Sequence, residues 1–273
     1  MTTPWDEQAE TILAAAAQGK TVAVARAITL VESGGPLADA LLSGLSPAPL
    51  SCQRIGITGP PGTGKSTLVA ALGQHLRAIE PGSPLAIVAV DPSSPYTMGA
   101  LLGDRFRMTQ LANDPQVFIR SMASRGALGG LSAATEAACD VLAHAGHRRI
   151  IVETVGVGQN EVEVAHACDV TVVVLNPESG DSVQALKAGL MEIADVVIVN
   201  KADLEGADRF VADVEAGLEL RGGSRHVAVP VVRCVATRGE GVDKAWQAIS
   251  EVWRQRVASG ELANSRRVRL GER

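Results

Sequence analysis

The chain has 273 residues and a net charge of −5, and 46% of its residues are hydrophobic while only 3% are aromatic. This length suits one sizeable domain with a terminal extension, and the negative charge gives no electrostatic basis for nucleic acid as a main partner. The sequence has no apolar run approaching the ~18 residues that span a membrane, and its first residues lack a secretory signal, so we expect a cytoplasmic protein with no membrane partner.

Residues 1–50 are predicted to form an N-terminal helical extension. Helix-forming residues or helically spaced apolar residues indicate helices over residues 10–18, 21–32 and 37–45. Gly19 and the run Ser33-Gly34-Gly35-Pro36 separate these helices, and Ser46-Pro47-Ala48-Pro49 is typical of a linker.

From residue 51 to residue 258 the pattern becomes strand, loop and helix, repeated. The expected strands cover residues 54–58, 85–90, 116–120, 149–153, 169–175, 195–199 and 227–234. The expected helices cover residues 65–79, 130–145, 161–166, 182–193, 208–220 and 242–257. The strands are nearly continuous in Val and Ile, which predicts an α/β fold with a mostly parallel central sheet flanked by helices on both faces.

Residues 259–273 are predicted to be a short basic C-terminal tail. We interpret the Arg-rich end of the chain as a solvated helix face and tail. The arginines concerned are Arg254, Arg256, Arg266, Arg267, Arg269 and Arg273.

A complete phosphate-binding loop follows the first expected strand. The pattern GxxxxGKS is matched in full by Gly59-Pro60-Pro61-Gly62-Thr63-Gly64-Lys65-Ser66. The expected helix begins within this run, at Lys65, and continues through Thr67. The glycines let backbone N–H groups turn toward phosphates, and the helix adds its positive N-terminal end. We expect Lys65 to neutralise the β- and γ-phosphates and Ser66 to hold Mg²⁺. The sequence therefore predicts a P-loop nucleotide-binding domain.

Three carboxylates are candidates for metal or water contact beside this loop. Asp91 and Glu153 each end an expected strand, and Asp104 lies in the loop beyond Asp91. Mg²⁺ prefers oxygen ligands, and ligands of parallel sheets bind at the carboxyl ends of the strands. The N–H of Gly156 is a candidate donor to the γ-phosphate, so loss of that phosphate would release the loop as a switch.

The motif Asn200-Lys201-Ala202-Asp203 follows another apolar strand and predicts guanine recognition. One carboxylate can accept both the N1–H and the exocyclic amine of guanine, whereas adenine has no N1–H, so Asp203 disfavours ATP. The stem of Lys201 can lie over the base. The run Val235-Ala236-Thr237 stands where many GTPases contact the guanine oxygen, and with Val in place of Ser that contact would be made by the backbone alone.

The residue that positions the attacking water is left open by the sequence. The candidates are Arg105, Arg107, Arg125 and Gln159. None of them is placed convincingly, so we expect slow intrinsic hydrolysis that a partner accelerates.

Several longer runs resemble the MeaB/ArgK family of G-protein chaperones for adenosylcobalamin-dependent acyl-CoA mutases. The resemblance covers roughly residues 20–257. The runs that carry it are Val90-Asp91-Pro92-Ser93-Ser94, Leu102-Gly103-Asp104-Arg105, Arg125-Gly126-Ala127-Leu128-Gly129-Gly130, Val152-Glu153-Thr154-Val155-Gly156-Val157-Gly158-Gln159 and Gly189-Leu190-Met191-Glu192-Ile193-Ala194-Asp195.

The resemblance implies a protein that binds GTP, GDP and Mg²⁺, hydrolyses GTP, dimerises around the nucleotide and gates cobalamin loading or removal on a mutase. It assigns Glu153 to the second switch and Asp91 and Asp104 to the Mg²⁺ loop, and it allows an adenosyltransferase as a further partner. A segment over residues 176–188 would sense the mutase through Asp181, Gln184 and Lys187. The run Asn176-Pro177-Glu178-Ser179-Gly180 and Phe106 depart from the family pattern. The mutase could therefore act on methylmalonyl-, isobutyryl- or 2-hydroxyisobutyryl-CoA.

Other functions of the same broad class fit the sequence less well. A nickel- or zinc-insertion GTPase would need a Cys/His tract, which the scattered Cys52, Cys139, Cys168 and Cys234 and the separate histidines do not supply. A small-molecule kinase would need an acceptor site, and none is evident. A translocation GTPase would normally carry its own docking domain.

Overall fold

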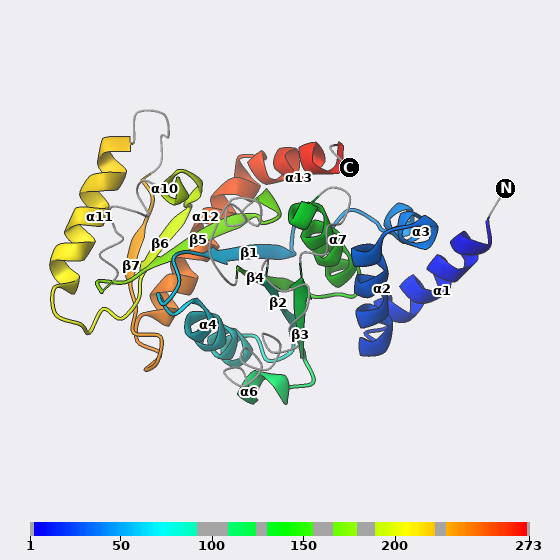
Figure 1. The fold of residues 1–273 in the computed structure, drawn as a ribbon, viewed down its shortest axis with the longest axis horizontal. Helices are drawn as coiled ribbons and strands as arrows, with labels where there is room; N and C mark the ends of the chain where they lie inside the picture. The colour runs from blue at the N-terminus through cyan, green and yellow to red at the C-terminus, as the bar shows by residue number, and fades with distance from the viewer. Residues whose placement is uncertain are drawn as a thin grey trace.

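The central feature of the fold is a parallel β-sheet, seen in a computed structural model that describes residues 3–91, 109–123, 130–154, 166–178, 189–221 and 228–271. Within these residues the sheet has seven strands in the order β3-β2-β4-β1-β5-β6-β7 (Figure 1). The strands are β1 (Gln53–Thr58), β2 (Leu85–Asp91), β3 (Val117–Ala123), β4 (Arg149–Thr154), β5 (Val170–Leu175), β6 (Val196–Val199) and β7 (Val231–Arg233). The predicted parallel α/β architecture is confirmed.

Burial explains why the apolar runs form the middle of the sheet. Every residue of β1, β5 and β6 is buried, as expected for strands covered on both faces. Strand β1 pairs in parallel with β4 on one side and β5 on the other, with Gly56 opposite both Val152 and Thr171. The carboxyl ends of these strands therefore meet at one edge, directly before the phosphate loop.

Helices cover both faces of the sheet. They are α1 (Pro4–Ala17), α2 (Thr21–Ser33), α3 (Pro36–Gly44), α4 (Lys65–Ile79), α6 (Thr109–Ala112), α7 (Gly130–His144), α10 (Leu190–Ile193), α11 (Ala207–Arg221), α12 (Val242–Ala258) and α13 (Glu261–Gly271). Helices α4 and α12 pack on one face, while α7, α10 and α11 pack on the other. No helix in the described part of the chain is both long and apolar enough to cross a bilayer.

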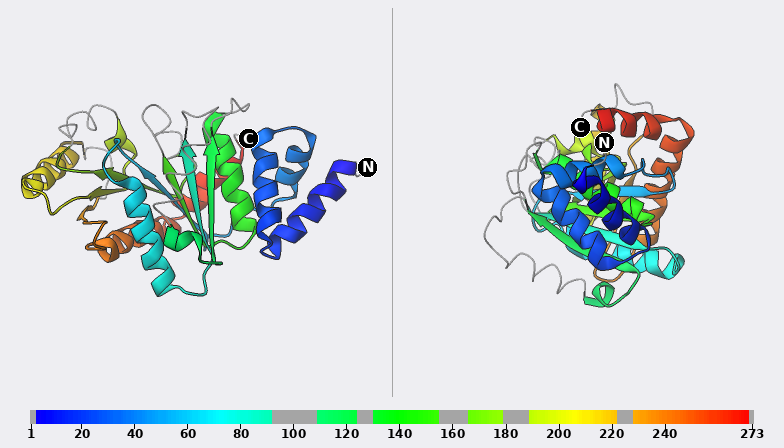
Figure 2. Two further views of the ribbon diagram at one scale, coloured as in Figure 1. Left: turned by 60° about the horizontal axis from the view of Figure 1, so that its bottom comes forward. Right: turned by 90° about the vertical axis from the view of Figure 1, so that its right-hand side faces the viewer.

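The N-terminal helices share a core with the sheet. Buried side chains of α1, α2 and α3 belong to the same cluster as those of α7, β2 and β4, and Figure 2 shows these three helices stacked beside α7. Helix α1 begins at Pro4, earlier than predicted, because Thr3 and Asp6 form a reciprocal capping box. Each of the two side chains accepts a hydrogen bond from the backbone N–H of the other residue. Arg120 of β3 adds an ion pair of 2.6 Å with Glu32 of α2. The helical extension is therefore tied to the sheet by packing and by charge.

The interpretation of the Arg-rich end as a solvated face and tail is wrong for Arg256 of α12, whose guanidinium binds the buried carboxylate of Asp195. It is also wrong for Arg266 and Arg269. Both lie on α13, and their guanidinium groups bind the carboxylate of Asp169, whose side chain is fully buried just before β5. Burial alone would raise the pKa of Asp169, but the hydrogen bonds and charge of Arg266, with the charges of Arg54 and Arg269, hold it below its ordinary value. Sequence periodicity could not show this contact, because the partners are 97 residues apart.

Replacing Arg266 with alanine should lower the free energy of unfolding by about 3 kcal/mol, because the buried Asp169 carboxylate loses a bidentate partner. This is the low end of the range for a broken buried ion pair, since Arg269 still pairs with Asp169. The change also removes donors to the carbonyls of Pro49 and Cys52. The matched control is Arg267→Ala, since Arg267 is exposed and donates to Asn264 of its own helix. Urea unfolding measures both, and equal loss in the two variants would contradict the anchoring role.

Strand β7 is shorter than predicted. The sequence pattern extended the strand over residues 227–234, but the structure has only Val231–Arg233 in this strand. Pro230, directly before it, has no N–H to give to a ladder. Residues 161–165 of the expected helix over 161–166, and residues 182–188 of that over 182–193, lie outside the described residues. Within the second range the structure has the short helix α10, which begins at Leu190 after the N-cap residue Gly189.

Candidate nucleotide-binding site

The phosphate loop connects β1 to α4 at the carboxyl edge of the sheet. Its lysine is 7% exposed, and Lys65 Nζ donates to the carbonyl oxygens of Gly59 at 2.6 Å and Pro60 at 3.0 Å. The buried Thr63 also bonds within the loop, its hydroxyl donating to the same Pro60 carbonyl at 2.9 Å. The loop thus holds a buried ammonium group inside its own curve, at the N-terminus of a 15-residue helix.

Two glycines of this loop cannot be replaced without moving other parts of the site. Gly59 has φ 140°, and a Cβ there would overlap the carbonyl oxygen of Val174 in β5. Gly64 has φ 89°, and its Cβ would overlap Nδ2 of Asn200. Because both φ values favour glycine, and neither position has room for a side chain, the loop sequence is required by its neighbours as well as by its own turn.

A carboxylate from β4 meets the hydroxyl that follows the lysine. Ser66 Oγ donates to Glu153 Oε1 at 2.5 Å, and Glu153 is 1% exposed. A hydroxyl oxygen and a carboxylate oxygen side by side are the donor types that Mg²⁺ prefers, so these two residues fit a magnesium ion. Asp91 is the last residue of β2, as predicted.

The base motif is joined to the phosphate loop by Asn200, which is 3% exposed. Its Nδ2 donates to the carbonyl of Thr63 at 2.9 Å, and its Oδ1 accepts the N–H of Ala236 at 3.1 Å. One side chain therefore links the ends of β1, β6 and β7. The sequence predicted that the three segments would bind one nucleotide, and the structure brings them together; it does not test the contacts to the nucleotide itself.

The two charged residues of the base motif have ionic partners that sequence reasoning missed. Lys201 Nζ lies 2.7 Å from Glu178 Oε2, and Asp203 Oδ2 lies 3.1 Å from Nη2 of Arg238. Lys201 has φ 55°, the single positive value found for a residue other than glycine among the described residues. Glu178 stood in a run that departs from the family pattern, whereas Arg238 gave no signal beyond its place after Thr237.

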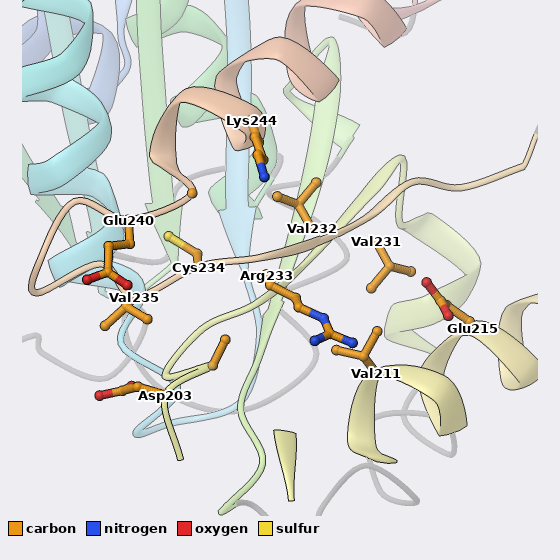
Figure 3. Close-up of a pocket in the computed structure, with 12 residues that line it drawn as sticks. Asp203, Val211, Glu215, Val231, Val232, Arg233, Cys234, Val235, Glu240 and Lys244 are labelled. Atoms are coloured by element: carbon orange, nitrogen blue, oxygen red, sulfur yellow. The ribbon is translucent and has the colours of Figure 1, made fainter. Parts of the chain in front are cut away.

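A cavity of about 520 Å³ opens beside Asp203, between α11, β7 and the start of α12 (Figure 3). Figure 3 shows Asp203, Val235 and Glu240 at one end and Glu215 at the other, with Lys244 between them. The cavity therefore adjoins the base motif from the outer edge of the sheet.

Some predicted residues lie outside the part of the chain that the structure describes. They are Asp104, Gly156, Asp181, Gln184 and Lys187, together with the candidate water-positioning residues. Of Asp91 only the backbone is described. Their roles stay predictions.

A phosphate loop between the first strand and the following helix of an all-parallel sheet, with a base motif held against it, defines a P-loop nucleoside triphosphatase. The family model described as "Methylmalonyl Co-A mutase-associated GTPase MeaB" matches residues 24–272. The chain belongs to the MeaB family, and it is a GTPase.

Individual relatives agree with this membership. A protein of Pyrococcus horikoshii named as a GTPase is 46% identical over 258 residues, covering 93% of this chain and 81% of that protein. The mitochondrial methylmalonic aciduria type A homolog of Mus musculus is 38% identical over 267 residues, covering 91% of this chain and 64% of that protein. A crystal structure of an LAO/AO transport system kinase is similar with a TM-score of 0.77 and 30% identity, covering 100% of this chain and 83% of that one.

Proposed function

We propose that this GTPase is a chaperone that docks on an adenosylcobalamin-dependent acyl-CoA mutase and gates the loading or protection of its cofactor. The observation that carries the proposal is the family match, whose description names a methylmalonyl-CoA mutase. The name of the mouse relative, which refers to methylmalonic aciduria, points the same way. The partner mutase would act on methylmalonyl-, isobutyryl- or 2-hydroxyisobutyryl-CoA.

The phosphates would be held by the loop that the structure places before α4. Backbone N–H groups at the helix N-terminus favour anions, and the ammonium of Lys65 lies inside the loop where β- and γ-phosphates would sit. The residues proposed to line this part are Gly59, Gly62, Thr63, Gly64, Lys65, Ser66 and Thr67, with Gly156 as a donor to the γ-phosphate. Lys65 would stabilise charge that develops as the γ-phosphoryl group leaves.

Mg²⁺ would be held by Ser66 and Glu153, whose oxygens lie 2.5 Å apart, with Asp91 and Asp104 as further proposed ligands. When bound, the ion would supply positive charge to the β- and γ-phosphates. Burial of Glu153 keeps its carboxylate next to the hydroxyl and limits access of bulk water. The arrangement supports phosphoryl transfer to water in a site whose charges are already oriented.

Guanine would be recognised at the ends of β6 and β7. Asp203 would accept both donors of the guanine edge, the Lys201 stem would cover the ring, and Asn200 would hold both loops in place. The backbone of Val235, Ala236 and Thr237 would face the guanine oxygen; its position is fixed by the bond from the Ala236 N–H to Asn200. Cytoplasmic location, a homodimer and an adenosyltransferase partner belong to the same proposal.

The test is stimulation of GTP hydrolysis by purified mutases acting on each of the three acyl-CoA substrates. We expect one mutase to raise the hydrolysis rate and to co-migrate with the protein in the presence of a guanine nucleotide. Bovine serum albumin at equal concentration controls for nonspecific effects. If none of the mutases changes the rate or co-migrates, the mutase part of the proposal is wrong while the GTPase activity stands.

A further inference from the structure

Four charged side chains alternate in sign around the base motif. Glu178 follows β5, Lys201 and Asp203 follow β6, and Arg238 follows β7. They form two ion pairs, Glu178 with Lys201 at 2.7 Å and Arg238 with Asp203 at 3.1 Å. The two residues expected to read the base are thus each held by a residue from a neighbouring strand end.

The backbone fixes where Arg238 stands. The turn after β7 is closed by hydrogen bonds from the Val235 N–H to the Glu240 carbonyl and from the Arg238 N–H to the Val235 carbonyl, both 2.9 Å. The N–H of Ala202 donates to the carbonyl of Cys234 at 3.1 Å, which ties the loop of Asp203 to the same turn. Arg238 is therefore presented to Asp203 by two loops that are bonded to each other.

The second pair is anchored in the same way. Asn176, buried at the end of β5, donates to the Gly62 carbonyl of the phosphate loop at 3.4 Å, and Glu178 comes two residues later. Lys201 stands opposite with its backbone in the left-handed region, a conformation that costs energy for a residue with a side chain. Its side chain runs from β6 toward the end of β5, and the ammonium group ends on Glu178.

These pairs are too exposed to be needed for the fold. The exposed fractions of the side chains are 38% for Lys201, 58% for Glu178, 59% for Arg238 and 34% for Asp203. Exposed ion pairs add little to stability. A carboxylate has about four lone-pair positions, so Asp203 can keep the Arg238 contact and still accept two donors from guanine. The pairs are therefore suited to orienting side chains for a ligand.

We propose that Arg238 and Glu178 are positioning residues of the base site, which hold Asp203 and Lys201 in their guanine-binding orientation before the nucleotide arrives. This rests on the proposed role of Asp203 in base recognition. Orientation in advance saves the rotamer entropy that would otherwise be lost on binding, so it raises affinity without a direct contact to the ligand. The benefit is confined to ligands that carry guanine.

The experiment is a titration of GDP, ADP and inorganic tripolyphosphate against the full chain carrying Arg238→Gln, Glu178→Gln or both. Each single change should weaken GDP binding about two- to fivefold, and the double change about tenfold if the pairs act independently. Tripolyphosphate binding should not change, because it lacks a base. The matched control is Arg254→Gln, which removes another exposed ion pair, with Glu251 on α12.

Two further measurements separate positioning from a merely structural role. Arg238→Lys should restore part of the GDP affinity, and the difference between wild type and variants should shrink as ionic strength rises, because exposed pairs are screened by salt. Variants that bind GDP as tightly as wild type would overturn the proposal. Variants that bind GDP more tightly would also overturn it, by showing that Arg238 and Glu178 compete with guanine for Asp203 and Lys201. Asp203→Asn is measured alongside: if it leaves GDP affinity unchanged, the base assignment itself fails, independently of Arg238.

Discussion

Replacing Asp203 with asparagine should weaken GDP and GTP binding about 10³-fold and allow xanthine nucleotides to bind instead. Guanine presents two donors, N1–H and the exocyclic amine, and a carboxylate accepts both. An asparagine amide would point an N–H₂ group at one of them, and an unpaired or opposed polar group in a binding site is costly. Xanthine carries an oxygen where guanine carries the amine, so it can accept from that amide.

The measurement is equilibrium titration with GDP, xanthosine diphosphate and ADP. Wild type should bind GDP and not ADP, and the variant should prefer the xanthine nucleotide. Asp208→Asn is the matched control, because Asp208 lies five residues later at the start of α11 with a side chain that is 87% exposed. Retained GDP preference in the Asp203 variant would show that another group reads the base.

The sequence predicted those parts of the molecule that depend on local pattern. The buried β5 and β6 follow from runs made almost entirely of Val, Ile and Leu. The loop before α4 follows from glycine spacing and the adjacent strand. Helix α12 begins at Val242, as its apolar spacing predicted. The segments of the site came together because carboxyl ends of parallel strands share one edge, a property of the fold class rather than of single residues.

The missed features depend on contacts between distant side chains. Arg266 and Asp169 are 97 residues apart, and nothing in the local pattern separates Arg266 from the exposed Arg267 beside it. Arg238 and Glu178 likewise stand in turns, where composition is polar for many reasons. Their partners could be named only once the strand order placed β5, β6 and β7 side by side.

Replacing Lys65 with alanine should lower kcat/KM for GTP hydrolysis by at least about 10³-fold, the loss expected when a preorganised charge at a transferred phosphoryl group is removed. Lys65 is 7% exposed, and its ammonium lies within 3.0 Å of two carbonyl oxygens of its own loop. Bound phosphate groups must therefore offer the Lys65 ammonium stronger hydrogen-bond acceptors than the carbonyl oxygens of Gly59 and Pro60. Charged phosphate oxygens meet that condition, because hydrogen bonds to ionised acceptors are roughly twice as strong as neutral ones.

This substitution also tests whether the lysine acts on the phosphates or only closes the loop. If it acts on phosphates, Lys65→Ala should weaken tripolyphosphate and GTP binding and slow hydrolysis, while far-ultraviolet circular dichroism shows an intact fold. Lys20→Ala, at an exposed residue before α2 with no side-chain cap bond, is the matched control. The change Lys65→Arg keeps the charge but introduces a larger, planar group, so it should restore binding more than hydrolysis. A variant whose hydrolysis rate stays within a few-fold of wild type would show that the positive end of α4 is sufficient by itself.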